Sequence, residues 1–316
     1  MAYSLDRSAA AAGGQSEVKS GMPQIQPGYP LPNETNYAAL ERGDILYFPR
    51  GPELISGMDV EFLRQTALST GSHHKNIAYK PDKDRVSGFD TSADVKRLHT
   101  VMRGYSQQAL GFLRTTLPLY AADWQVDYAS FRPQEEQGRD LAQKKRNDLL
   151  HVDAFPTRPT HGNLILRFFT NIHREKARVW EVSDPMADLA PRYAEAAGLK
   201  RIAKRGQSAP GRVFRAATGL LHDAGLPVVD RAPYDQFMLG FHDYLKANAD
   251  YQTSTKRYRF EFPPGSAWMV FTDIVPHSVL SGRFGLEQTV IVNRQALSDP
   301  ARAPITILES LCGTTL

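Results

Sequence analysis

A histidine and an aspartate stand one residue apart at His151 and Asp153, within the run "LLHVDAFP". Side chains two residues apart on an extended strand leave the same face, because successive residues point to opposite faces. On a helix, residues two apart do not face each other, so the same spacing would not chelate an ion. The apolar flanks and Pro156 favour an extended strand end, and we interpret the pair as part of a metal site.

One imidazole and one carboxylate hold a metal weakly, so a third ligand must come from a distant strand. Two histidines and one carboxylate form the facial triad of non-haem Fe(II) oxygenases, which leaves three positions open. The histidines that follow the pair are His161, His173, His222, His242 and His277. His161 follows Asp153 too closely to belong to a separate late strand. We choose His277, which lies between the strand-like "WMVFTDIVP" and the turn-like "LSGRFG".

The remaining histidines have plainer interpretations. His222 and His242 each precede an aspartate on a predicted helix, which indicates solvated helix faces. His173 begins a second His-x-Glu pattern, but that pattern lies in a polar turn, which we expect at the surface. For His151 itself the alternative is an ordinary histidine at the end of a strand, since short motifs arise by chance.

Arginines near the pair offer a cation for an anionic cosubstrate such as 2-oxoglutarate, because a guanidinium pairs with a carboxylate through two hydrogen bonds. Arg167 stands among apolar residues in "LILRFF", where its burial is costly unless it meets an anion. Alternation places Arg167, Phe169 and Asn171 on one face of a predicted strand. It places Arg178 and Trp180 on one face of the next strand.

Arg178 and Arg294 are weaker candidates than Arg167, and Arg132 is a further one. Arg132 lies just upstream of the pair in "SFRP" and is a candidate contact for cosubstrate or substrate. For Arg294, and also for Arg178, a salt bridge to Glu181 or Glu287 is the plainer alternative.

The composition limits the classes of function. The chain has 316 residues, a formal net charge of +4 and one cysteine, Cys312. This charge is too small to indicate nucleic-acid binding, although it suits an anionic ligand. A single cysteine excludes an intramolecular disulfide, so we expect a cytoplasmic protein. No secretory signal and no run of about 18 apolar residues is present, which leaves only peripheral contact with a membrane.

The order of patterns along the chain predicts a mainly β fold. We expect a disordered tail over residues 1–35 and one domain over residues 36–316. Apolar residues recur every three to four positions from Val95 to Leu113, which predicts a helix before the β region. The runs "GNLILRFFTNI" and "ARVWEVSD" predict two antiparallel strands joined by a polar turn.

The predicted β core covers residues 125–183 and 256–295, and a helical insertion covers residues 185–250. Strands and helices do not alternate, and no G-x-G-x-x-G or G-x-x-x-x-G-K-[ST] is present, so a parallel α/β sheet is disfavoured. We therefore predict a double-stranded β-helix core (jelly-roll, cupin-like) with N-terminal helices and a helical insertion.

Three longer stretches of the sequence resemble a known family. "LLHVDAFPTRPTHGNLILRFFTNIHREKARVWEV", "VPHSVLSGRFGLEQTVIV" and "SHHKNIAYKP" resemble the Kdo hydroxylases, Fe(II)/2-oxoglutarate-dependent dioxygenases of Gram-negative bacteria. The resemblance runs from about Asp44 to the C-terminus. It implies hydroxylation of 3-deoxy-octulosonic acid (Kdo) at C3 to give Ko, in the lipopolysaccharide inner core, with Kdo-lipid A as acceptor.

The resemblance also implies roles for single residues. It assigns His151, Asp153 and His277 to iron, and it implies 2-oxoglutarate contacts from the strands that carry Arg167, Asn171, Arg178 and Trp180. O2 is the second cosubstrate, and ascorbate is a supporting reductant. Relatives in the wider superfamily place a basic residue about ten positions after the second histidine, where this chain has "GLEQT". The carboxylate partner is therefore expected on the earlier strands, with Arg283 and Arg294 in reserve.

A lipid-linked acceptor implies approach to the cytoplasmic face of the inner membrane. The basic and apolar run "KRYRF" is one candidate contact, and a solvated edge strand is its alternative. Two other functions remain open for the whole chain. One is a non-catalytic jelly-roll module that binds an acidic sugar, and the other is a cupin-type metal enzyme that does not use 2-oxoglutarate.

Overall fold

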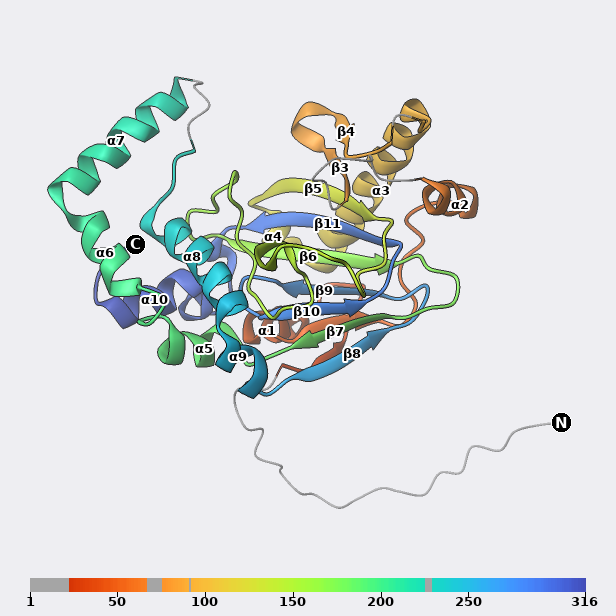
Figure 1. Ribbon diagram of the computed structural model, residues 1–316. Helices are drawn as coiled ribbons and strands as arrows, with labels where there is room; N and C mark the ends of the chain where they lie inside the picture. Colours follow the sequence, from red (N-terminus) through yellow and green to blue (C-terminus); the bar gives the residue numbers. More distant parts are fainter. Residues whose placement is uncertain (1–22, 67–75, 91, 225–228) are drawn as a thin grey trace, which may run out of the picture.

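The computed structural model describes residues 23–66, 76–90, 92–224 and 229–316 (Figure 1). The two histidines of the string "SHHKNIAYKP" lie outside these residues.

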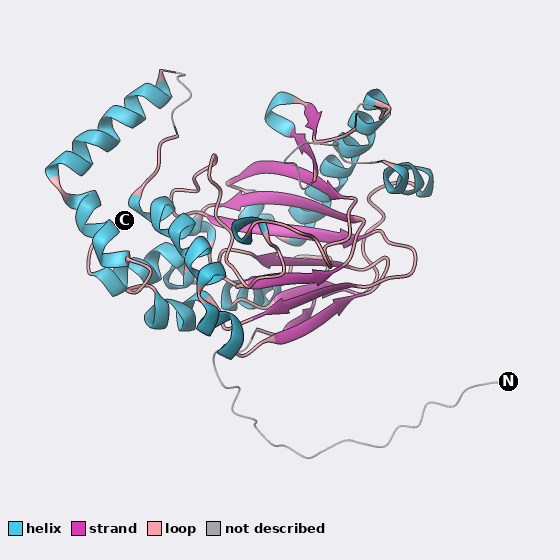
Figure 2. Cartoon of the chain, in the orientation of Figure 1, coloured by secondary structure: helices cyan, strands magenta, loops and turns pink. Residues whose placement is uncertain are grey.

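Strands and helices segregate into a β core with helices around it (Figure 2). The strands are β1 (Ile25–Pro27), β2 (Ile45–Phe48), β3 (Ile77–Lys80), β4 (Arg85–Ser87), β5 (Trp124–Arg132), β6 (Leu164–Asn171), β7 (Arg178–Val182), β8 (Tyr258–Phe262), β9 (Ala267–Phe271), β10 (His277–Ser281) and β11 (Gly285–Val292). The helices are α1 (Glu34–Arg42), α2 (Gly57–Gln65), α3 (Val95–Thr116), α4 (Pro118–Ala121), α5 (Met186–Tyr193), α6 (Leu199–Gln207), α7 (Ala209–Asp223), α8 (Pro233–Ala247), α9 (Ala249–Ser254) and α10 (Pro304–Cys312).

The strands form two sheets. The larger has eight strands in the order β1-β2-β9-β6-β11-β5-β3-β4, and the smaller has three in the order β10-β7-β8. All neighbouring strands are antiparallel except β1 and β2, which are parallel. The expected jelly-roll core with N-terminal helices and a helical insertion is confirmed.

Aromatic side chains fill the space between the two sheets. Trp268 of β9 is fully buried, and its ring stacks on Phe262 of β8 with centroids 3.9 Å apart. It also stacks on Phe169 of β6 at 5.3 Å and meets Trp180 of β7 edge-on at 5.6 Å. Residues from both sheets thus share one core, which fixes the distance between the sheets.

Helix α3 covers the outer face of the large sheet, where it packs on β3, β5 and β11. Asp94 caps its first turn by accepting a hydrogen bond from the Arg97 N–H at 3.0 Å, which satisfies a donor that the helix itself cannot. The buried residues of the helix recur every three to four positions, as the sequence predicts, and include Leu98, Met102 and Tyr105.

One strand pairing expected from the sequence is wrong. β6 and β7 follow each other in the chain, but β6 pairs with β11 and β9 in the large sheet. β7 pairs with β10 and β8 in the small sheet. The alternation of apolar residues reports which face of a strand is buried and not which strand lies beside it. The two strands therefore face each other across the core instead of forming a hairpin.

The predicted tail also extends too far. Residues 1–22 lie outside the described chain, but residues 25–27 form β1, which pairs with Ile45–Tyr47 of β2. α1 then begins at Glu34. The short strand joins the edge of the large sheet through backbone hydrogen bonds, which a composition rich in Pro and Asn does not reveal.

The segment between β7 and β8 is helical and comprises α5 to α9. In α8, Phe237, Met238, Phe241 and Leu245 are buried, so this helix packs one face inward. No helix of the described residues combines the length and apolar character needed to span a bilayer.

The interlayer aromatic cluster predicts a large loss of stability when its centre is removed. Trp268→Ala should lower the free energy of unfolding by about 3–5 kcal/mol, because the deletion leaves a cavity between sheets that cannot collapse freely. Urea denaturation followed by circular dichroism measures this change. Leu119→Ala, at an exposed position of α4, is the control and should change stability little, whereas equal effects of both variants would contradict the packing argument.

Candidate metal centre

The segment that carries His151 runs beside the first residue of β10. The His151 N–H donates to the His277 carbonyl at 3.1 Å, and the His277 N–H donates back to His151 at 2.9 Å. The Asp153 N–H donates to the Thr272 carbonyl at 2.9 Å. This extended backbone turns His151 and Asp153 to one side while Val152 is buried on the other. The extended geometry that the sequence predicts is present, as a single bridge and not as a full strand.

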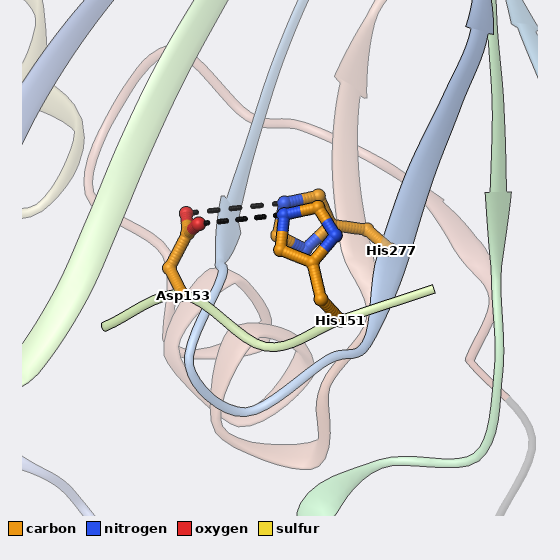
Figure 3. Close-up of side chains that lie close together, drawn as sticks. All are labelled: His151, Asp153 and His277. Atoms are coloured by element: carbon orange, nitrogen blue, oxygen red, sulfur yellow. Dashed lines mark ion pairs between the residues drawn. The ribbon is translucent and has the colours of Figure 1, made fainter. Parts of the chain in front are cut away.

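The three side chains that the sequence singles out converge (Figure 3). Nε2 of His151 lies 3.8 Å from Oδ1 of Asp153, and Nε2 of His277 lies 3.8 Å from Oδ2 of the same carboxylate. One donor atom of each residue lies within 4.8 Å of the others. Within the described residues, this is the one group of His, Cys, Asp or Glu side chains with the spacing of a metal site.

Backbone carbonyls set the tautomer of both imidazoles. Nδ1 of His151 lies 2.7 Å from the Leu149 carbonyl, and Nδ1 of His277 lies 3.0 Å from the Val275 carbonyl. A carbonyl oxygen only accepts, so in the neutral ring Nδ1 carries the proton and donates it. Each Nε2 then keeps a lone pair on the side of Asp153, which is the form in which imidazole binds a metal.

Burial and neighbouring charges give the three groups suitable protonation states. Burial, followed by the charges of His277 and Lys246, lowers the pKa of His151 well below its usual range. Burial also lowers the pKa of His277. Burial alone would raise the pKa of Asp153, but Arg167 and the two histidines outweigh it and hold that pKa well below its usual range. Two neutral imidazoles beside one carboxylate are ready to bind a cation.

The donor set fits divalent iron. Oδ2 of Asp153 is buried and accepts no hydrogen bond from the described residues. The Arg167 Nε lies 3.2 Å away as an ion pair without hydrogen-bond geometry. A buried carboxylate oxygen without a partner is costly, and a metal ion held with His151 and His277 would satisfy it. Two imidazoles and one carboxylate are the ligand set of the facial triad.

Aromatic rings hold the two imidazoles from both sides. The Trp180 ring stacks on His277 with centroids 5.2 Å apart and planes at 19°. The His242 ring meets His151 edge-on at 4.8 Å, and its Nδ1 lies 2.8 Å from the Val152 carbonyl. The expectation that His242 lies on a solvated helix face is therefore wrong. It stands four residues after the buried Met238, a helical spacing that places it beside the inward face of α8.

A lysine near the ligands escapes sequence reasoning. Lys246 of α8 is only 2% exposed, and its Nζ donates to the Lys144 carbonyl at 3.0 Å. Burial lowers its pKa to about 8, although the charge of Asp153 acts in the opposite direction. Lys246 stands four residues after His242 and follows the same helical spacing, which is the one sequence signal that could have identified it.

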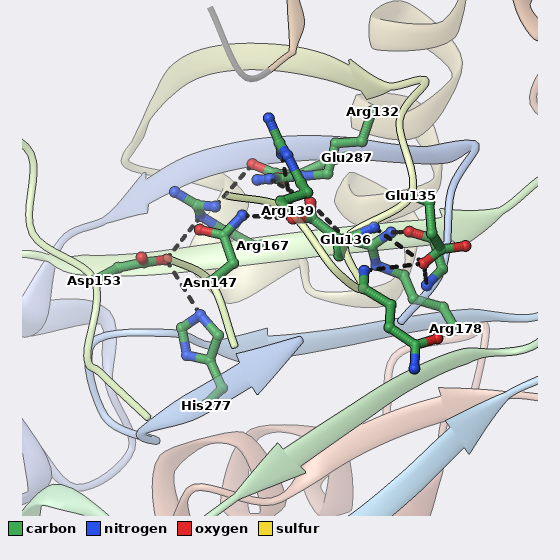
Figure 4. Close-up of polar contacts among 12 residues, drawn as sticks. Arg132, Glu135, Glu136, Arg139, Asn147, Asp153, Arg167, Arg178, His277 and Glu287 are labelled. Carbon is green, nitrogen blue, oxygen red and sulfur yellow. Dashed lines mark hydrogen bonds and ion pairs between the residues drawn. The ribbon is translucent and has the colours of Figure 1, made fainter. Parts of the chain in front are cut away.

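Buried charges continue from Asp153 along the inside of the core (Figure 4). Arg167 bridges Asp153 and Glu287, with its Nη1 3.0 Å from Glu287 Oε1. Arg132 donates to the other oxygen of Glu287 at 2.7 Å. Despite burial, the charges of Arg167 and Arg132 hold the pKa of Glu287 below its usual range, so the carboxylate stays ionised between the two arginines. Glu287 thus links Arg132 to Arg167, whereas the sequence suggests it only as a partner for Arg178 or Arg294.

Arg178 extends the same network but is paired less closely. Its side chain is 2% exposed, and its Nη2 lies 3.5 Å from Glu136 Oε1. Its Nη1 donates to the Gly282 carbonyl at 3.0 Å, while its buried Nε donates to no described residue. Burial, followed by the charge of Arg132, lowers the pKa of Arg178 to about 10. Arg178 therefore lacks a close carboxylate of its own.

Asn171 lies away from the metal ligands. Its side-chain amide donates to the carbonyls of Lys176 at 3.0 Å and Phe262 at 2.9 Å, and its oxygen accepts from the His173 N–H at 2.9 Å. These bonds tie the turn after β6 to β8. The amide is thereby fully engaged by backbone groups, which is a structural role.

The remaining histidines are not brought to the site. Nδ1 of His161 lies 3.6 Å from Asp235, and half of its side chain is exposed. His173 lies in the turn after β6, where its Nδ1 accepts from the N–H groups of Glu175 and Lys176. His222 belongs to α7, and its side chain lies outside what the structure describes.

An open pocket of about 520 Å³ lies next to the charge network. Its lining includes Glu136 of the network, the basic residues Arg139 and Arg146, and Leu280 of β10. Its size is typical of pockets that hold small ligands. The pocket thus brings two cationic side chains beside the strand that begins at His277, and each of them is paired with a carboxylate of the same lining, Arg139 with Glu136 and Arg146 with Asp148.

The triad predicts metal binding that depends on one imidazole. His151→Ala should lower the affinity for Co(II) or Fe(II) at least about 100-fold, because it removes a direct ligand, which exceeds the effect of losing a residue behind a ligand. Calorimetric titration of the apoprotein measures this change. His173→Ala removes the histidine of the second His-x-Glu pattern and should bind as tightly as the unmodified protein. Equal affinity in both variants would place the metal elsewhere.

Comparisons with known proteins agree with this geometry. The family model for 3-deoxy-D-manno-oct-2-ulosonic acid (Kdo) hydroxylase matches residues 26–315. A crystal structure of the Kdo hydroxylase KdoO, a non-haem Fe(II) α-ketoglutarate-dependent dioxygenase, in complex with α-ketoglutarate and Fe(III) is 32% identical, with a TM-score of 0.78. The match covers 93% of this chain and 97% of that one.

A structure of KdoO in complex with cobalt(II) is 33% identical, with a TM-score of 0.75, over 90% of this chain and 91% of that one. No curated protein sequence matches the chain. The family model spans nearly the whole chain, and the similarity to KdoO in sequence and fold extends equally far. This protein belongs to the Kdo hydroxylase family.

Proposed function

We propose that the protein hydroxylates Kdo units of a glycolipid, with Fe(II) and 2-oxoglutarate, at C3 to give Ko. The observation that carries the proposal is the buried triad of His151, Asp153 and His277, whose tautomers and charges suit a divalent metal. Family membership supports Kdo as the substrate. The complexes of KdoO with α-ketoglutarate, succinate and Fe(III) support the cosubstrate.

When bound, Fe(II) and 2-oxoglutarate would supply the activation of O2 for C–H hydroxylation, with succinate and CO2 as by-products. The chain contributes the fixed orientation of the ligands. His151 and His277 would bind through Nε2, because Nδ1 of each is committed to a backbone carbonyl. Trp180 and His242 restrain the two imidazoles and exclude water from their outer sides.

Arg178 is our candidate partner for the distal carboxylate of 2-oxoglutarate. Arg132 and Arg167 each have a carboxylate oxygen of Glu287 within 3.0 Å, whereas the Glu136 oxygen lies 3.5 Å from Arg178. A buried guanidinium with an unused N–H favours an incoming anion. Arg167 instead has the supporting role of holding Asp153 ionised.

The acidic sugar would occupy the open pocket lined by Arg139 and Arg146. Arg139 is paired with Glu136 at 3.3 Å and Arg146 with Asp148 at 2.5 Å. A carboxylate or phosphate of the acceptor would share these guanidinium groups at the open side of the pocket, where Arg146 is 42% exposed. The acceptor would be Kdo-lipid A or another Kdo-containing glycolipid. The proposed partners do not include a nucleic acid.

A glycolipid acceptor requires peripheral contact with a membrane, and we propose the cytoplasmic face of the inner membrane. The free Cys312 suits a reducing compartment. The run "KRYRF" is a poor candidate for the contact, because Arg257 is paired with Glu181 at 2.7 Å and Arg259 with Glu261 at 3.4 Å. These residues belong to the region of β8, an edge strand of the small sheet.

Two other functions compete with this proposal. A sugar-binding module without turnover needs no buried carboxylate between two neutral imidazoles. A cupin-type metal enzyme without 2-oxoglutarate would not need the incompletely paired Arg178. Anaerobic addition of Fe(II) and 2-oxoglutarate separates both from the proposal, since only the proposed enzyme should develop a visible charge-transfer band.

The proposed reaction predicts a defined product. Incubation of Kdo-lipid A with the protein, Fe(II), ascorbate and 2-oxoglutarate should add one oxygen atom to a Kdo unit, because hydroxylation replaces C–H by C–OH. Mass spectrometry of the lipid measures the gain, and Asp153→Ala, which lacks one metal ligand, is the control. Product formation without 2-oxoglutarate, or no product with the full mixture, would contradict the proposed reaction.

The proposed role of Arg178 predicts an effect on cosubstrate binding alone. Arg178→Lys keeps the charge but loses the planar fork. It should raise the KM for 2-oxoglutarate about 10-fold or more, since a charge-assisted hydrogen bond contributes roughly 1.5–3 kcal/mol. Steady-state kinetics and a separate Co(II) titration measure KM and metal affinity. Arg259 forms an exposed ion pair on β8, so Arg259→Lys is the matched control. An unchanged KM for 2-oxoglutarate in Arg178→Lys would assign the role to another arginine.

A further inference from the structure

Helix α7 carries an apolar stripe that the fold does not cover. Its residues Val213, Ala216, Ala217, Leu220 and Leu221 follow the spacing i, i+3, i+4, i+7, i+8, which places them on one side of a helix. We call these five residues the α7 stripe. In a globular protein such a stripe normally faces the core. Here all five are exposed, including Leu220 at 72% and Val213 at 69%.

The position of α7 explains this exposure. The helix extends away from the β core at the upper left of Figure 1, and α6 connects it to the body of the protein. α6 packs on α7 at one end and against α8 and α10 on the other side. Leu199, Ala203 and Gly206 of α6 are buried, and Gly206 lies against Pro233 of α8. The pair α6–α7 is therefore an arm whose base is fixed and whose outer helix offers its apolar stripe to an external partner.

The charge of the arm indicates which partner it fits. Between Glu195 and Asp223 the sequence contains six Lys or Arg residues and no Asp or Glu. On α6, Lys200, Arg201, Lys204 and Arg205 are all exposed. Basic side chains next to an exposed apolar stripe are the combination that binds the interface of an anionic bilayer. A second copy of the chain fits poorly, because the exposed basic residues of α6 in the two copies would repel each other.

The base of the arm is connected to the metal centre through α8. α6 packs on α8, and α8 carries His242, whose ring contacts His151. Eight residues past the end of α7, Arg231 donates to the carbonyl of Pro156, three residues past Asp153. Binding of α7 to the bilayer would therefore hold the metal ligands at a fixed position relative to the lipid headgroups.

We propose that α6 and α7 form a membrane-docking arm, in which the α7 stripe enters the interface of an anionic bilayer and the basic residues of α6 contact lipid phosphates. The inference rests on the proposed glycolipid acceptor and names the surface that reaches it. α7 has 15 residues and is thus about 22 Å long. A helix of this length lies along the interface and does not span the bilayer.

Vesicle binding of the full-length protein tests the arm. The unmodified protein should sediment with vesicles that contain phosphatidylglycerol and much less with vesicles of phosphatidylcholine alone. Val213→Asp with Leu220→Asp should lower binding by about tenfold or more, since each change removes an apolar side chain that would be buried in the interface. Lys204→Glu with Arg205→Glu should also weaken binding, by about fivefold for each charge removed. Met58→Asp, at a 78% exposed position of α2, is the control and should bind as the unmodified protein does.

Any of three results would contradict the proposed docking role of the arm. These are no binding of the unmodified protein to phosphatidylglycerol vesicles, binding of the arm variants equal to that of the unmodified protein, or a dimer in solution that Val213→Asp with Leu220→Asp separates into monomers. The last result would identify a second copy as the partner of the stripe. Circular dichroism checks that each variant is folded.

A second measurement separates this inference from the proposed function. With the glycolipid dispersed in neutral detergent, the arm variants should turn over as fast as the unmodified protein, and they should be slower only on vesicles. Slow turnover in detergent as well would overturn a pure docking role. If neither the unmodified protein nor the arm variants hydroxylate the glycolipid in detergent, the proposed function fails. The vesicle-binding result would still show whether the arm binds membranes.

Discussion

The candidate site depends on one reciprocal pair of backbone hydrogen bonds, between His151 and His277. These two bonds join the segment that follows β5 to the start of β10, two parts of the chain separated by 125 intervening residues. The bridge fixes both imidazoles side by side, and the bond from Asp153 to Thr272 adds the carboxylate. All three side chains are thus positioned by backbone groups, whose geometry changes little when surface residues move.

Burial of this site creates an electrostatic problem that the core must solve. Asp153, Glu287 and Glu136 are ionised away from water, and each is costly unless a cation is near. Arg167, Arg132 and Arg178 supply these cations from three different strands of the two sheets. The chain of alternating charge keeps Asp153 in its metal-binding form. It also leaves Arg178 under-compensated, which is the physical reason to assign it an external anion.

The helical insertion links the site to the outside of the protein. Its inward helix α8 supplies His242 and Lys246 beside the ligands, whereas its outward helix α7 exposes an apolar stripe. One inserted segment thus contributes both to the wall of the metal centre and to the surface that we propose for membrane contact. With the glycolipid acceptor that we propose, this arrangement would couple the orientation of the protein on the bilayer to the access of the sugar to the site.

The sequence by itself determined the local features: the spacing of His151 and Asp153, the helix from Val95, the apolar strands and the anomaly of Arg167 among apolar neighbours. Each depends on residues near one another in the chain, where the periods of two and 3.6 apply. Partners across the core were decided by the tertiary structure, because alternation specifies a buried face and not the strand opposite it. For that reason the sequence predicts one hairpin for β6 and β7 and a solvated position for His242, and it does not specify the partners of the three arginines, which depend on how the two sheets face each other.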